Sequence, residues 1–445
     1  MKRMLTGALM LLWGAVLAAS TAAPPALPHQ AAQQSVGTVN CASSTCHGAV
    51  APWQGSTVQQ NEYTTWSRLD KHAQAYAVLL NPLSRSIAAK LGLKQGAENA
   101  PECLDCHSHN PAPARRGERH QVTDGVGCEA CHGPAGQWII SHTAPGNRHA
   151  DNLARGLYPT ERPREQARLC LSCHVGDKTR YVSHRIMGAG HPRLGFELDT
   201  FSKLAPAHYK IDADWQQRKG DYDSVRLWAI GQALAAQNQL ELLTDPKRGR
   251  DGLFPELALF DCHACHHPMS ERKWTARLGV GPGRMRLNDS NLLMLRAIVR
   301  AIEPASAERF SQQVDQLHQA VAGNSADPLA LAGALSASIE HYLQRLEQQR
   351  FSPALQRAVL AALVDEARRA QFSDYAGAEQ AYMAISSLAA GLAQQGALGP
   401  AKNLTELNRQ LASLRRLLAS EQAYQPAPFA QGLQALSRTL TQQAN

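Results

Sequence analysis

From Asn288 onward, hydrophobic residues have the spacing of one face in a series of α-helices. Apolar side chains recur every three or four residues, as in Phe310, Val314, Leu317 and Val321, or in Leu335, Ile339, Leu343 and Leu346. Residues that commonly begin helices precede such runs at Asp289-Ser290, Asp327-Pro328, Ser352-Pro353, Ser373-Asp374 and Asn403. The pattern predicts six or seven amphipathic helices that form a bundle with its own core, an α-helical domain over residues 286–445.

A second helical pattern covers residues 64–80. Trp66, Leu69, Tyr76 and Leu80 share one face at helical spacing, and His72 lies close to that face. A histidine in such a place is either an ordinary core residue or a ligand of a cofactor that packs against the helix.

The first residues have the composition of a secretory signal. Lys2 and Arg3 precede an apolar run over residues 5–18, and small residues follow it. We therefore predict a signal peptide over residues 1–22 and a periplasmic or otherwise exported protein. The run is short for a transmembrane helix. An uncleaved membrane tether stays open as an alternative, but nothing beyond the signal peptide indicates membrane association.

All ten cysteines lie in five motifs in which a histidine directly follows the second cysteine. Two thiols at this spacing can add to the two vinyl groups of one haem, and the adjacent histidine can then bind its iron. The motifs are Cys41, Cys46 and His47; Cys103, Cys106 and His107; Cys128, Cys131 and His132; Cys170, Cys173 and His174; Cys262, Cys265 and His266. Four motifs have two residues between the cysteines, and the first has four. They predict five covalently bound haems c, each with one iron.

Zinc sites and disulfide bonds are the alternatives. Paired Cys-x-x-Cys also occurs in zinc ribbons, and an exported chain with ten cysteines could form five disulfides. Neither requires a histidine after the second cysteine. Histidine stands there in all five motifs, although it makes up only 18 of 445 residues. Haem attachment therefore explains the pattern better.

Each iron needs a second ligand or keeps an open position. We predict His72, His142 and His191 as further iron ligands. His142 follows the third motif by ten residues, and glycines beside His191 would let the backbone approach a flat macrocycle. His109 and His120 lie in a polar loop and stay ambiguous.

The charge balance does not indicate nucleic-acid binding. The formal net charge is +8, and removal of the two basic residues of the signal peptide lowers it to +6. Five haems would bring ten propionates, a charge of about −10 when ionised. Many arginines lie between the motifs, and their planar side chains suit pairing with propionates.

Three segments resemble a known family. TTWSRLDKHAQAY (residues 64–76), GVGCEACHGPAGQWIISH (residues 125–142) and CLSCH (residues 170–174) are similar to the motifs of the tetrahaem cytochrome c that accepts electrons from hydroxylamine oxidoreductase. The resemblance covers about residues 41–174. It implies a mostly helical, haem-dominated fold with closely stacked haems, bis-histidine ligation of most irons and one five-coordinate haem. It supports His72 and His142 as ligands.

The chain departs from that family in its expanded first motif, its fifth motif and its long helical C-terminal part. We therefore predict a mainly α protein with little regular sheet: a pentahaem cytochrome c domain over residues 23–285, followed by the helical bundle.

The sequence favours an electron carrier with a redox protein as donor and another as acceptor, and no nucleic-acid partner. Thirteen histidines remain after the five of the motifs, enough to close every iron. The alternative is a redox enzyme that acts on a small nitrogen or sulfur compound at one open-coordination haem. No catalytic residue can be named, so whether the protein is an enzyme stays open.

Overall fold

The computed structural model describes residues 23–266, 277, 280–281, 284–323, 326–398 and 401–441. The signal peptide predicted over residues 1–22 lies outside the described residues, as does His267, which follows the fifth motif. The fold is mainly α, as predicted. The sheet among the described residues is one antiparallel pair, β1 (Arg250–Asp251) and β2 (Phe254–Pro255). Within the described residues, no helix combines the length and apolar character needed to cross a membrane.

Short helices form the first half of the chain, which we call the motif layer (residues 23–223). They are η1 (Thr38–Cys41), α1 (Glu62–Leu69), η2 (Lys71–Gln74), α2 (Ala75–Val78), α3 (Pro82–Leu91), η3 (Ala97–Asn99), α4 (Pro101–His107), η4 (Pro113–Arg115), η5 (Val122–Asp124), α5 (Cys128–His132), η6 (Ala135–Gln137), η7 (Ser141–Thr143), α6 (His149–Ala154), α7 (Pro163–His174), α8 (His184–Ala189), α9 (Leu198–Leu204) and α10 (Ala213–Lys219), where η marks a 3-10 helix.

Longer helices form the second half, which we call the bundle (α11 to α18). The elements from residue 224 onward are α11 (Ser224–Thr244), η8 (Leu257–Leu259), η9 (Cys262–Ala264), α12 (Ser290–Ile302), α13 (Pro304–Val321), α14 (Pro328–Gln348), α15 (Pro353–Arg368), α16 (Tyr375–Gln394), α17 (Ala401–Leu417) and α18 (Pro426–Thr441). Within the described part of the chain, seven helices follow residue 288, which matches the prediction of six or seven, and most predicted starting residues stand at helix N-termini.

The helix predicted over residues 64–80 is divided in the structure. It ends at Leu69, because the backbone of Asp70 is extended (φ −86°, ψ 128°). The Asp70 carboxylate accepts a hydrogen bond from the backbone N–H of His72 (2.9 Å), a local contact that competes with helix continuation. His72 therefore lies on the short helix η2 rather than inside a long helix.

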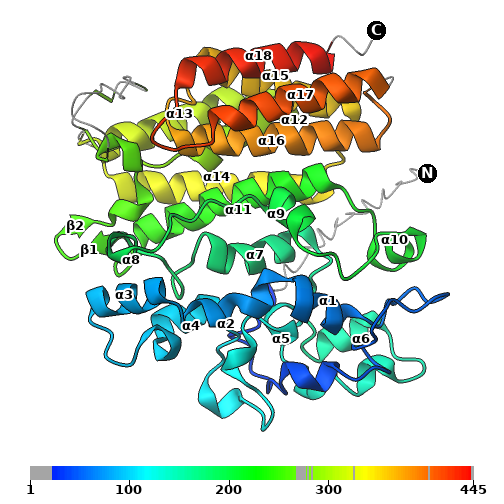
Figure 1. Ribbon diagram of the computed structural model, residues 1–445. Helices are drawn as coiled ribbons and strands as arrows, with labels where there is room; N and C mark the ends of the chain where they lie inside the picture. Colours follow the sequence, from blue (N-terminus) through cyan, green and yellow to red (C-terminus); the bar gives the residue numbers. More distant parts are fainter. Residues whose placement is uncertain are drawn as a thin grey trace, which may run out of the picture.

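Helix α11 joins the two layers, as Figure 1 shows. The carboxylate of Asp223 caps its first turn by accepting from the N–H groups of Val225 and Arg226. The helix is buried on nearly all sides, and it contacts α7 and α9 of the motif layer as well as α12, α14 and α16. An all-round apolar helix is expected only at such a central position.

The main hydrophobic core is continuous from Ala167 to Leu440. The core therefore extends across the domain boundary that was predicted between residues 285 and 286. The boundary itself stays a prediction. The motif layer has little core of its own: a second cluster consists of Leu79, Ala88, Ala97 and Leu104, and α1 contains no buried residue. Large apolar side chains such as Leu69 are exposed there (67%).

Candidate haem-binding sites

Ten histidines lie in five face-to-face or edge-to-face pairs, and each of the five motif histidines belongs to one pair. The centroid separations are 6.2 Å for His47–His142, 6.0 Å for His72–His174, 6.4 Å for His107–His191, 6.2 Å for His132–His208 and 6.2 Å for His184–His266. In every pair the second histidine comes from a segment far from the motif in sequence. The separations are almost identical although the segments differ.

This separation fits a metal ion between two imidazoles. A ring nitrogen binds a metal at about 2 Å, so two rings on opposite sides of one ion have centroids on the order of 6 Å apart. A haem iron with two histidine ligands has this arrangement. The residues present therefore fit five haems, each attached through the two cysteines of a motif and held by one histidine pair.

The hydrogen bonds of the ring nitrogens support this interpretation. In five of the ten paired histidines, Nδ1 contacts a carboxylate or backbone carbonyl oxygen, which orients the ring and leaves Nε2 for the iron. The contacts are His47 to Glu62 (2.9 Å), His72 to Asp70 (3.0 Å), His107 to Ala75 O (2.9 Å), His142 to Ile139 O (2.6 Å) and His191 to Pro192 O (2.8 Å).

Several histidines outside the pairs show the opposite pattern, because their Nε2 atoms bind protein groups. His149 contacts Glu161 (2.9 Å), His318 contacts Asp289 (3.1 Å) and His341 contacts Glu303 (3.3 Å). His109 contacts Ser35 Oγ (2.8 Å), and its ring lies 5.6 Å from that of His120. The structure therefore places the ambiguous His109 and His120 beside each other and not opposite a motif histidine.

Burial favours the protonation state that binds metals. It lowers the pKa of both His132 and His174 to about 4, so their rings are neutral near pH 7. A neutral imidazole has the free lone pair that coordination requires. Asp70 has the opposite effect on His72, whose pKa is raised by its hydrogen bond to that carboxylate. A carboxylate in this place increases the basicity of a histidine ligand.

Local helical geometry brings the groups of each motif together. In α4, α5 and α7 the motif forms the last turn, where residues three apart lie on the same face. In the fifth motif, the N–H of His266 donates to the carbonyl oxygen of Cys262 (2.8 Å). The two cysteines and the histidine are thereby presented to one side.

The expanded first motif closes in the same way. The N–H of His47 donates to the carbonyl oxygen of Cys41 (3.2 Å), the same link from histidine to first cysteine as in the fifth motif. The additional residues form a turn in which the N–H groups of Cys46 and Gly48 donate to Ser43 O (both 2.9 Å). A Cβ at Gly48 would lie 1.9 Å from Ala42 O, so the turn requires glycine there.

Cysteines of different motifs meet in pairs. Contact with Cys128 lowers the pKa of the Cys41 thiol, and contact with Cys106 lowers that of Cys173 to about 6. The first motif therefore lies against the third, and the second lies against the fourth. Among the described residues all ten thiols are free, and no group of three or more His, Cys, Asp or Glu side chains could hold a single metal ion.

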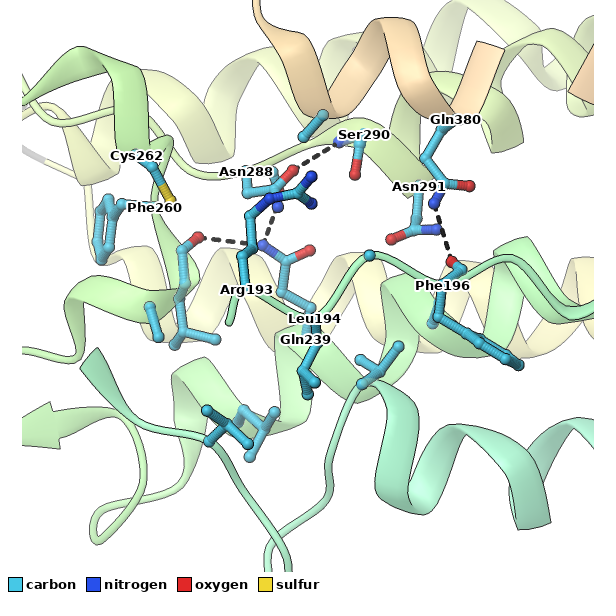
Figure 2. A pocket seen from close by; sticks show the side chains of 18 of the residues that line it. Arg193, Leu194, Phe196, Gln239, Phe260, Cys262, Asn288, Ser290, Asn291 and Gln380 are labelled. Atoms are coloured by element: carbon cyan, nitrogen blue, oxygen red, sulfur yellow. Dashed lines mark hydrogen bonds between the residues drawn. The ribbon is translucent and has the colours of Figure 1, made fainter. Parts of the chain in front are cut away.

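A cavity lies beside the fifth motif, between the motif layer and the bundle (Figure 2). Its volume is about 100 Å³, it opens to solvent, and Cys262, Met187 and Arg193 are among its lining residues. Helix α8 begins at His184, the partner of His266. The backbone N–H of His184 donates to the Glu256 carboxylate (2.8 Å). The cavity is thus placed to receive part of a haem held at Cys262.

All three ligands predicted outside the motifs lie opposite a motif histidine. His72 pairs with the fourth motif, His142 with the first and His191 with the second. The sequence did not single out His184 and His208 as ligands, since neither stands on a periodic apolar stripe. The only sequence signal for His184 and His208 was that the chain holds enough histidines outside the motifs to give every iron a second ligand.

Comparison with known proteins gives one match. The family model described as cytochrome c554 and c-prime matches residues 40–133, which contain the first three motifs. No curated protein and no solved structure matches the chain. The match supports a c-type cytochrome, an electron carrier with covalently bound haem c, and it does not extend to hydroxylamine oxidoreductase as the particular electron donor.

Proposed function

We propose that this chain is an exported electron-transfer protein with five covalently attached haems, each iron held by two histidines. One observation carries the proposal: every motif histidine faces a second imidazole at 6.0–6.4 Å between centroids. The family match supports haem c chemistry for the first three motifs. The repeated geometry extends it to the fourth and fifth.

The paired histidines favour a carrier over an enzyme. Each haem supplies an iron that can accept and release one electron. An iron with two histidine ligands has no free position, so substrate could bind only after a ligand dissociates. The family resemblance implies one five-coordinate haem. In this structure each of the five motif histidines has a partner histidine, which argues against an iron with an open position.

The contacts between motifs suggest which haems exchange electrons directly. Cys41 lies against Cys128, and Cys106 lies against Cys173. The fourth motif is connected to the cavity of the fifth by Phe196, whose ring stacks on His174 (4.3 Å between centroids, 16° between planes) and also lines that cavity. These contacts make the first haem a neighbour of the third, and make the second and the fifth haems neighbours of the fourth.

Exposed apolar side chains in the motif layer agree with this proposal. Leu69 and Leu83 are 67% and 54% exposed although they stand beside paired histidines in sequence or space. Flat apolar macrocycles against the short helices would remove such surface from water, which is favourable by about 25 cal/mol per Å².

The proposal is tested with the mature protein isolated from an export-competent host. Intact mass should equal the polypeptide plus five haems. Carbon monoxide added to the fully reduced protein should leave the spectrum unchanged, because no iron is open. Four haems would mean that one motif, most simply the expanded first one, is unoccupied. Stoichiometric carbon monoxide binding at one haem, together with turnover of nitrite or hydroxylamine, would replace the carrier by the enzyme.

A further inference from the structure

The side chain of Arg180 reaches the place where two haem-attachment motifs meet. Its Nη1 lies 2.9 Å from Sγ of Cys173 in the fourth motif. Cys173 in turn contacts Cys106 of the second motif strongly enough to raise the pKa of the Cys106 thiol. The guanidinium group is therefore at the edges of two adjacent haem sites.

The positive charge of Arg180 has no carboxylate partner at ion-pair distance among the described residues. Its Nε is buried and makes no hydrogen bond. Some partly buried arginines are paired with carboxylates, such as Arg164 with Glu340 (2.7 Å) and Arg193 with Glu379 (2.9 Å). An unpaired buried charge is costly, so its retention at this place needs an explanation.

The surroundings do not cancel the charge completely. Asp177 lies on the same turn, and its carboxylate accepts from the backbone N–H groups of Thr179 (2.6 Å) and Arg180 (2.9 Å). Burial lowers the pKa of the neighbouring His29 to about 4, so that ring is neutral near pH 7. Asp177 thus shapes the turn that presents Arg180, and the guanidinium contacts the Cys173 thiol directly.

A fixed positive charge beside a haem stabilises the reduced form, because reduction adds an electron to the macrocycle and iron. The effect is strong where water is excluded and weak where water screens the charge. We propose that Arg180 raises the reduction potentials of the two haems attached at the second and fourth motifs, relative to the other three. This inference rests on the proposed function, and it adds a residue that sets the potentials within the haem chain.

The test is a potentiometric titration of the fully loaded protein, followed by visible absorbance. Arg180→Gln removes the charge, and two of the five components are expected to shift to lower potential. Arg180→Lys keeps the charge and should keep most of the wild-type profile. The matched control is Arg248→Gln: Arg248 also carries one positive charge and holds the same loop through solvent-exposed hydrogen bonds to Lys178 O (3.0 Å) and Thr179 O (3.1 Å), but among the described residues it makes no hydrogen bond to a motif cysteine. Its titration should equal that of the wild type.

Unchanged potentials in Arg180→Gln, or an equal shift in Arg248→Gln, would overturn the inference. If Arg180→Gln does not accumulate, Arg180→Met offers an apolar chain of similar reach for the same measurement. Intact mass of each variant separates this inference from the proposed function. Fewer than five haems in the wild type would contradict the proposed function, whereas the Arg180 comparison depends only on haems at the second and fourth motifs.

Discussion

Replacement of His208 by alanine is predicted to open one haem iron. The ring of His208 lies 6.2 Å from that of His132 in the third motif, and burial lowers its pKa, which keeps it available as a neutral ligand. Loss of this strong-field ligand should convert that iron from low spin to high spin. The structure contains five such pairs, so the high-spin fraction should be one in five, or 20% of the haem.

Low-temperature EPR of the oxidised variant measures this fraction, and carbon monoxide titration of the reduced variant should show one equivalent bound. His149→Ala is the matched control, because His149 is also in the motif layer but uses Nε2 to contact Glu161 (2.9 Å). An entirely low-spin His208→Ala protein would refute the pairing, and so would a high-spin signal in the His149 control.

Three further predictions follow from the same geometry. EPR of the wild type should contain two classes of low-spin haem, since two pairs have nearly parallel rings (15° and 31°) and three have nearly perpendicular ones (82–84°); a single class would contradict the pair geometry. In the bundle, burial acts to raise the pKa of Asp289, but Arg277 (2.6 Å) and His318 lower it overall. Asp289→Asn should therefore cost about 3–5 kcal/mol of unfolding free energy near neutral pH. The carboxylate contributes stability above its unfolded-state pKa of about 3.9. Urea denaturation should therefore show that the difference in unfolding free energy between variant and wild type narrows as the pH falls below that value. Finally, deletion of residues 286–445 uncovers α11, where Leu227, Trp228 and Ile230 are at most 1% exposed. Exposure of three such side chains costs up to about 5–9 kcal/mol, comparable to the 5–15 kcal/mol by which a whole domain is typically stable. The shortened protein should fail to accumulate in soluble form, and a soluble form with five haems would show that the helices are an independent unit.

Local signals in the sequence predicted the local features well. The helix starts at Asp327-Pro328 and Ser352-Pro353 are correct, because a capping side chain and a proline at the first helical position act within one turn. The break at Asp70 was missed, because apolar spacing continues through it and the competing hydrogen bond to His72 is visible only in three dimensions.

Features that depend on contacts between distant parts of the chain were harder to predict from the sequence. His72 and His142 were named through apolar spacing and family resemblance, whereas His184 and His208 become ligand candidates only when the fold brings them opposite His266 and His132. The extent of the core is a second example. Helix α11 is apolar on nearly all sides, which indicates burial, but nothing in its sequence says that α14 and α7 are the helices that cover it.

The histidine pairs also explain how the motif layer can hold its shape with so little core. Each pair connects segments far apart in sequence, as in His107 with His191, and a haem between them would tie the segments through two iron bonds and two thioether bonds. The buried clusters there are small, and α1 buries no side chain. In the bundle, by contrast, leucines and alanines supply a continuous apolar core. The stability of the motif layer should therefore depend on haem attachment, because binding free energy that requires the folded arrangement is folding free energy.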